Sequence, residues 1–124
     1  MHEASVARNL VELVSDELAA AGCPPWVRVA LLRVRIGRLN SVAPGALRSA
    51  FEVAKRRTPL HEARMEIEFV ELRVWCERCA CERNPTEPTR LLCPTCGGRC
   101  PKLLRGSELE LASIELAHEE AAAQ

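Results

Sequence analysis

Six of the seven cysteines lie between positions 76 and 100, and four of them form two closely spaced pairs. Cys76 with Cys79 and Cys93 with Cys96 are Cys-x2-Cys pairs, separated by thirteen residues. A turn of this kind aims two sulfur atoms at one metal ion, and zinc prefers a closed tetrahedron of thiolates at structural sites. Gly97 follows the second pair and can take the positive φ that lets the chain turn away. The two pairs therefore predict a structural zinc site.

The cysteines leave two alternatives open. A Cys-x2-Cys motif can be a redox dithiol, but that motif normally opens a helix in a thioredoxin-like βαβ setting. Here two copies lie in a stretch rich in proline and glycine, which favours zinc. Cys81 and Cys100 could each replace a neighbouring ligand, and we expect both to be spare thiols. Cys23 lies far away, near the end of a predicted helix, where we expect it to act as a small hydrophobic residue.

His2, the second residue of the chain, could hold a different metal. The amine of Met1, the amide nitrogen of His2 and its imidazole can close adjacent chelate rings on one ion. Planar, nitrogen-rich coordination suits Ni(II) or Cu(II) rather than zinc. Glu3 would add an oxygen or a further backbone nitrogen. A terminal histidine can equally be a frayed residue without a metal role, so the residues alone leave both interpretations open.

Composition excludes several classes of function. The chain has 124 residues, of which 48% are hydrophobic, and 17 basic residues balance 17 acidic ones. This neutral balance argues against a general polyanion binder, and 3% aromatic residues are too few for a base-stacking platform. We see no secretory signal, and no apolar run of the roughly 20 residues that a membrane span needs. No nucleophile–base pair or paired catalytic carboxylates stand out, so we expect no catalytic activity.

The remaining sequence predicts an ordinary set of helices and strands. Residues 4–21 have helical apolar spacing, and Pro44 suits the first turn of a second helix. Three stretches predict strands, at 26–36, 65–69 and 108–116, with phase shifts after Phe69 and Leu111 that suggest bulges. Residues 24–61 contain eight basic residues and one acidic one, and residues 106–124 contain five acidic residues and no Lys or Arg. This charge pattern indicates a solvated face or a docking patch.

These elements predict an α+β fold. Three strands and two helices form a two-layer α/β domain from residues 1–74 plus 104–124, which a four-cysteine zinc ribbon at 75–103 interrupts. An insert this short cannot bury enough apolar surface alone, so metal binding would supply its folding energy.

Several stretches follow a recognisable order along the chain, namely Met1–Ala7, Val34–Leu47, Ala50–Glu52, Met65–Glu68, the two cysteine pairs, Gly106–Leu111 and Ser113–Glu115. In these motifs and their order, nearly the whole chain resembles the HypA/HybF-type nickel metallochaperones, the hydrogenase nickel-incorporation proteins.

The resemblance implies a nickel-binding α/β domain interrupted by a zinc ribbon. Such proteins deliver Ni(II) to the large subunit of [NiFe]-hydrogenase, together with a nickel-binding GTPase, and some members also serve urease. His2 and Glu3 match the family's nickel positions, to which we add the Met1 amine. Cys76, Cys79, Cys93 and Cys96 match its structural zinc ligands. We further expect a cytoplasmic monomer or weak homodimer that binds neither nucleic acid nor membrane.

Two departures from the family pattern matter for the metal sites. Some members place an acidic residue near the nickel, in the loop before the second helix, but residues 39–43 here contain none. Ala80 stands where glycine is usual after the first cysteine pair.

A zinc-ribbon module acting on nucleic acid or a protein complex, or a thiol redox protein, would also explain the cysteines, but neither explains the N-terminus.

Overall fold

The computed structural model describes residues 2–117, so Met1 and His118 lie outside the described part. The chain forms two compact units: unit 1 contains residues 35–42 and 67–110, and unit 2 contains residues 2–34, 43–66 and 111–117. Three long strands contribute residues to both units. The expected division at residues 75 and 103 stays a prediction.

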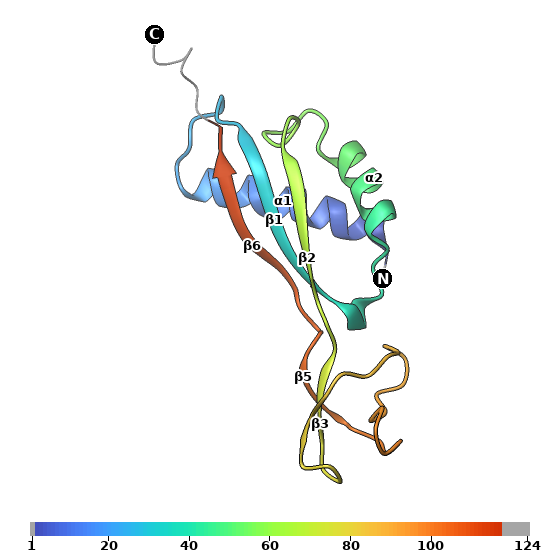
Figure 1. Ribbon diagram of the computed structural model, residues 1–124. Helices are drawn as coiled ribbons and strands as arrows, with labels where there is room; N and C mark the ends of the chain where they lie inside the picture. Colours follow the sequence, from blue (N-terminus) through green and yellow to red (C-terminus); the bar gives the residue numbers. More distant parts are fainter. Residues whose placement is uncertain (1, 118–124) are drawn as a thin grey trace. The chain divides into compact units, whose positions relative to one another are not determined.

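Two helices and two small sheets confirm the predicted α+β class, in the predicted order along the chain (Figure 1). One sheet has the strand order β2-β1-β6 and the other β4-β3-β5. No helix among residues 2–117 is long and apolar enough to cross a membrane. The elements are α1 (Glu3–Ala20), β1 (Val29–Gly37), the 3-10 helix η1 (Arg38–Asn40), α2 (Pro44–Ala54), β2 (Arg64–Val70), β3 (Arg73–Cys76), β4 (Cys81–Arg83), β5 (Lys102–Arg105) and β6 (Leu109–Leu116).

Helix α1 forms because its apolar residues recur every three or four positions. Six of them are buried as one stripe, namely Val6, Ala7, Leu10, Val11, Val14 and Leu18. Leu13 is 43% exposed. It lies about 100° around the helix from Val14, at the edge of the stripe next to Val6. Gly22, with φ +75°, follows the C-cap and ends the helix.

Helix α2 begins at Pro44, the predicted first-turn proline, and buries Leu47 and Phe51. Figure 1 shows α1 crossing one face of the β2-β1-β6 sheet in its unit 2 part, with α2 beside α1. Two basic side chains of α2 and its C-cap donate hydrogen bonds to backbone carbonyls near β2. Arg48 reaches Met65 O at 2.7 Å, and Lys55 reaches Ala63 O at 3.0 Å. These bonds help to satisfy carbonyl groups that an edge strand leaves unpaired.

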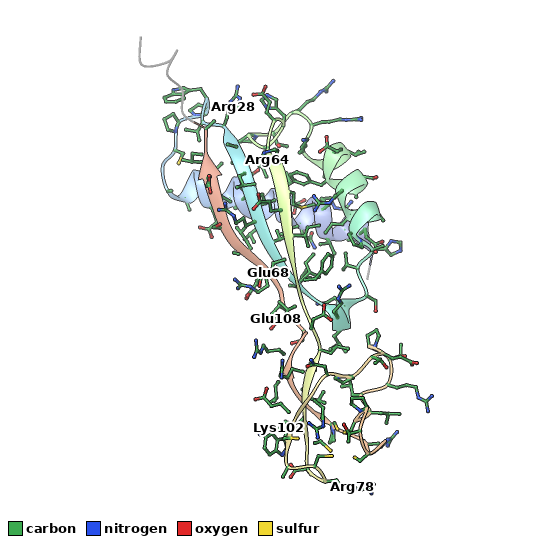
Figure 2. The ribbon with its side chains drawn as sticks, viewed as in Figure 1. Arg28, Arg64, Glu68, Arg78, Lys102 and Glu108 are labelled. Carbon is green, nitrogen blue, oxygen red and sulfur yellow. The ribbon has the colours of Figure 1, made fainter. Side chains whose placement is uncertain are left out.

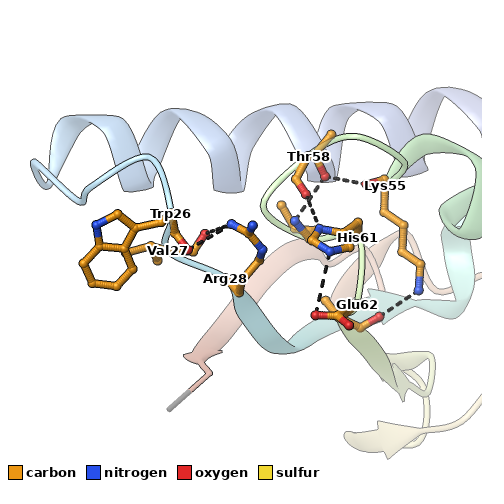
Figure 3. Close-up of polar contacts among 9 residues, drawn as sticks. Trp26, Val27, Arg28, Lys55, Thr58, His61 and Glu62 are labelled. Carbon is orange, nitrogen blue, oxygen red and sulfur yellow. Dashed lines mark hydrogen bonds and ion pairs between the residues drawn. The ribbon is translucent and has the colours of Figure 1, made fainter. Parts of the chain in front are cut away.

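Strand β1 starts three residues later than predicted. The Val27 N–H donates to Pro24 O, so the chain turns before it can extend. Arg28 Nη1 donates to Trp26 O at 2.9 Å, and the Trp26 side chain is 56% exposed (Figure 3). The two prolines in this turn lack the N–H groups that a strand would need.

The apolar phase shift after Phe69 marks a break between strands rather than the predicted bulge. Strand β2 ends at Val70, and β3 begins at Arg73 in the other sheet. The shift after Leu111 falls inside β6, which runs without interruption from Leu109 to Leu116.

Charged side chains on β1 pair with both neighbouring strands. In unit 2, Arg33 contacts Glu66 at 3.1 Å and Glu115 at 2.6 Å. In unit 1, Arg35 contacts Glu68 at 3.3 Å and Glu110 at 2.7 Å (Figure 2 labels Glu68). Part of the basic stretch and part of the acidic stretch therefore neutralise each other within the fold.

The core of unit 1 around β3 consists largely of sulfur. Val74, Cys76, Cys93 and Cys100 are buried together. Strand β3 pairs antiparallel with β4 and β5, and its register places Cys76 opposite Cys81 and Val74 opposite Arg83. So few apolar side chains provide little hydrophobic stabilisation, which leaves a role for a metal ion.

Candidate metal sites

The four cysteines of the two predicted pairs meet in unit 1. Their sulfur atoms, those of Cys76, Cys79, Cys93 and Cys96, all lie within 4.8 Å of one another. The Sγ–Sγ distance is 3.6 Å between Cys76 and Cys96 and 3.8 Å between Cys79 and Cys93. Sulfur atoms at about 2.3 Å from a tetrahedral zinc ion would be about 3.8 Å apart. The donor set and its spacing therefore fit zinc.

Backbone amides around these cysteines point at sulfur. Cys79 N lies 3.4 Å from Cys76 Sγ, and Cys96 N lies 3.4 Å from Cys93 Sγ. Gly98 N lies 3.4 Å from Cys96 Sγ, which gives the second pair one bond more. Such N–H···S bonds favour thiolate, the form that binds metal.

The pKa shifts of the clustered thiols differ in direction. The Cys96 backbone N–H lowers the pKa of Cys93 to about 6, and the Cys79 N–H lowers the pKa of Cys76. Burial raises the pKa of Cys79 to about 12. Without metal, the four groups would therefore not all be ionised at neutral pH. A bound divalent cation removes this difference, because a coordinating thiol loses its proton.

The spare cysteines stay outside the four-sulfur group. Cys100 is buried, its thiol lies 3.6 Å from Gly98 O, and burial raises its pKa. Cys81 faces Cys76 across the hairpin. Cys23 lies in unit 2 and is partly buried, as expected for a small hydrophobic residue.

Backbone geometry after each pair explains the glycine preference there. Gly97 has φ +74°, as predicted. Ala80 occupies the equivalent place and has φ +54°, a conformation that strains a residue with a Cβ. The alanine is therefore tolerated at this turn rather than favoured.

His2 is the N-cap residue of α1, with extended backbone angles and an exposed side chain. Its carbonyl accepts the first helical hydrogen bond, from Val6 N at 3.1 Å. Its imidazole makes no capping hydrogen bond. His61 is exposed as well, with Nδ1 3.0 Å from Thr58 O and Nε2 3.7 Å from Glu62 (Figure 3). Within residues 2–117, the four cysteines form the only group of three or more metal-binding side chains.

Glu3 begins α1, and its carboxylate reaches the start of the other helix. Glu3 Oε2 accepts a hydrogen bond from Ala43 N at 3.0 Å. Ala43 is the N-cap of α2 and has no side-chain cap of its own. This bond lowers the pKa of Glu3. The loop that lacks an acidic residue thus receives one from α1.

Arg83 is a charged neighbour of the cysteines that the sequence did not reveal. The thiols of Cys79 and Cys93 raise the pKa of the Arg83 guanidinium. Arg83 lies opposite Val74, which is buried together with Cys76, Cys93 and Cys100. Only the strand register brings this arginine back to the first cysteine pair, so spacing along the chain gives no signal for it.

Known proteins are similar to this chain in sequence and in fold. A protein named hydrogenase maturation factor HypA from Roseiflexus sp. (strain RS-1) is 40% identical over 115 residues, which cover 93% of this chain and 91% of that protein. One of the same name from Deinococcus radiodurans is 38% identical over 123 residues, 90% of this chain and 89% of that protein. The solution structure of the Ni metallochaperone HypA from Helicobacter pylori matches with TM-score 0.64 and 22% identity, covering 96% of this chain and all of that one.

A family model described as hydrogenase/urease nickel incorporation, metallochaperone, hypA matches residues 1–116. This range includes the four clustered cysteines as well as His2 and Glu3. The match to the family model and the two relatives agree with the resemblance found in the sequence. The chain belongs to the HypA family of nickel metallochaperones in hydrogenase and urease nickel incorporation.

Proposed function

We propose that this chain binds Ni(II) through Met1, His2 and Glu3 and delivers it to the large subunit of [NiFe]-hydrogenase. The observation that carries the proposal is the position of His2 as the N-cap of α1. The first four N–H groups of a helix have no intrahelical partner. The amides of His2 and Glu3 can therefore lose their protons to solvent and bind a metal ion without breaking a helical hydrogen bond.

The same position favours release of the metal. A helix N-terminus carries a partial positive charge, which opposes a bound cation. Deprotonated amides offset this charge while nickel is held, and reprotonation restores the repulsion. Ligands from an acceptor protein can replace the exposed His2 imidazole and the terminal amine one at a time. A site of this kind holds nickel as cargo.

Zinc has the opposite role in the proposal. Cys76, Cys79, Cys93 and Cys96 would hold Zn(II) in a closed site, where the ion supplies folding energy to the region around β3, which has few buried apolar side chains. We propose no redox cycling of these thiols and no enzymatic activity for the chain.

The proposed partners follow from the family. They are the nickel-binding GTPase of hydrogenase maturation and the hydrogenase large subunit, with urease as a second client. We also propose that the chain is a cytoplasmic monomer or weak homodimer. A zinc-ribbon module for nucleic acid is the weaker candidate, because it gives His2 no function.

Calorimetry on untagged, zinc-loaded protein tests the nickel site. We expect about one Ni(II) per chain, and no binding by His2→Ala or by a variant extended by one residue at the N-terminus. His61→Ala is the matched control, since His61 is an exposed histidine outside the site, and should bind like the wild type. Equal binding by all variants would place nickel elsewhere and overturn the proposal.

A further inference from the structure

Arg83 lies opposite Val74, a member of the buried cysteine cluster, and its side chain has no carboxylate partner among residues 2–117. Its Nε atom is buried and has no hydrogen-bond partner among the described residues. Its Nη1 atom reaches only the adjacent Glu82 O, at 3.4 Å. No carboxylate in residues 2–117 forms an ion pair with it, although Glu82 pairs with Arg73 at 3.4 Å. A buried arginine nitrogen without an acceptor is costly, so something must compensate for it.

The strand register explains why Arg83 points to the sulfurs. Arg83 lies directly opposite Val74 in the β3–β4 pair, and opposite residues project from the same face of a sheet. Val74 and Cys76 are two residues apart on β3 and share that face. The antiparallel pairing of β3 and β4 therefore places Arg83 on the same face of the sheet as Cys76, although Arg83 follows the first cysteine pair in the sequence.

We infer that Arg83 is a positioning residue for the zinc site, its guanidinium donating to the Cys79 and Cys93 thiolates and holding them around the metal. One Zn(II) and four thiolates leave an excess of negative charge in a partly buried site. A guanidinium presents several N–H donors in a planar fork and stays charged, so it can contact two sulfurs at once.

The inference rests on zinc as the occupant of this site, and it concerns retention of the metal. Partners outside the ligand set commonly change metal affinity by about 10–100-fold. Loss of the arginine charge should weaken the hold on Zn(II) by a factor in this range. The nickel site at the N-terminus takes no part in this expectation.

Zinc release to a chromophoric chelator at neutral pH tests the role, with zinc content measured beforehand by mass spectrometry. Arg83→Met keeps the length of the side chain and removes its charge, and it should release Zn(II) at least about tenfold faster than the wild type. Arg83→Lys keeps the charge without the fork and should be intermediate. Arg78→Met is the matched control, because Arg78 is exposed between the first two cysteines (Figure 2), and it should match the wild type.

The possible outcomes distinguish a failure of the role inferred for Arg83 from a failure of the zinc assignment. If Arg83→Met fails to retain zinc at all while Arg83→Lys retains it, the inference is supported. Equal release rates for Arg83→Met and Arg78→Met, or for the methionine and lysine variants at position 83, would overturn the role of the charge. Wild-type protein that binds no zinc would overturn the metal assignment itself. The charge-transfer bands of the Co(II)-loaded protein give a second readout, which should shift in Arg83→Met alone.

Discussion

Single residues around the metal sites carry strain that substitutions can reveal. Ala80 and Gly97 follow the two cysteine pairs at equivalent places, and both have positive φ. A residue with a Cβ pays about 1–2 kcal/mol for this conformation. We expect Ala80→Gly to raise the free energy of unfolding of the zinc-loaded protein by about 1 kcal/mol.

The matched substitution at the second pair should act in reverse. A Cβ at Gly97 would meet no atom within 4 Å, so Gly97→Ala tests backbone strain alone. It should lower the free energy of unfolding by about 1 kcal/mol in guanidinium titrations. A loss of stability in Ala80→Gly would show that its φ is not a source of strain.

Glu3 provides a pH-dependent contact at the start of α1. Hydrogen bonding to Ala43 N lowers the pKa of this carboxyl below 4.5. The contact is therefore fully present above pH 4.5 and is lost as the pH falls through the lowered pKa. The Ala43 amide resonance should titrate with a midpoint below 4.5, and this titration should vanish in Glu3→Gln. A midpoint above 4.5 would contradict the bond.

Two segments of unit 1 approach each other closely at Gly37 and Gly106. A Cβ on Gly37, the last residue of β1, would overlap the backbone carbonyl of Gly106. Gly37 N also donates to Glu108 O, and Leu39 N donates to Gly106 O at 2.8 Å. Backbone atoms cannot move aside as a flexible side chain does. Gly37→Ala should therefore cost about 1–3 kcal/mol of stability, measured by chemical denaturation.

Gly45 in α2 is the control for this substitution. No atom lies within 4 Å of a Cβ there, so Gly45→Ala should be neutral or stabilise the helix by up to about 1 kcal/mol. Equal effects at Gly37 and Gly45 would mean that the close approach to Gly106 is not tight.

Sequence reasoning succeeded for elements with local signals. The period of α1, the proline at the start of α2 and the spacing of the cysteines are all short-range patterns, and each was placed nearly to the residue. The contacts of Gly37 with Gly106, of Glu3 with Ala43 and of Arg83 with the cysteines depend instead on which strands and helices meet. No local pattern encodes such pairings, so they became visible only in the structure.

The whole molecule combines units with different sources of stability. Unit 2 buries apolar side chains such as Val14, Leu32 and Phe51, whereas the core around β3 in unit 1 has three cysteines and one valine. We therefore expect hydrophobic burial to stabilise unit 2 without metal, and the cysteine region to depend on the zinc ion proposed for its thiolates. Removing zinc should therefore unfold the cysteine region and leave unit 2 folded.

Two tryptophans report on the two regions separately. Trp75 lies in β3 beside the first cysteine pair, and Trp26 lies in unit 2. When a chelator removes zinc, the emission of Trp26→Phe, which reports Trp75, should shift to the red, because its surroundings become wet. The emission of Trp75→Phe, which reports Trp26, should stay constant, and the helical circular dichroism should persist. Loss of both signals together would show that zinc stabilises the entire fold, and the division of stabilising forces between the units would then be wrong.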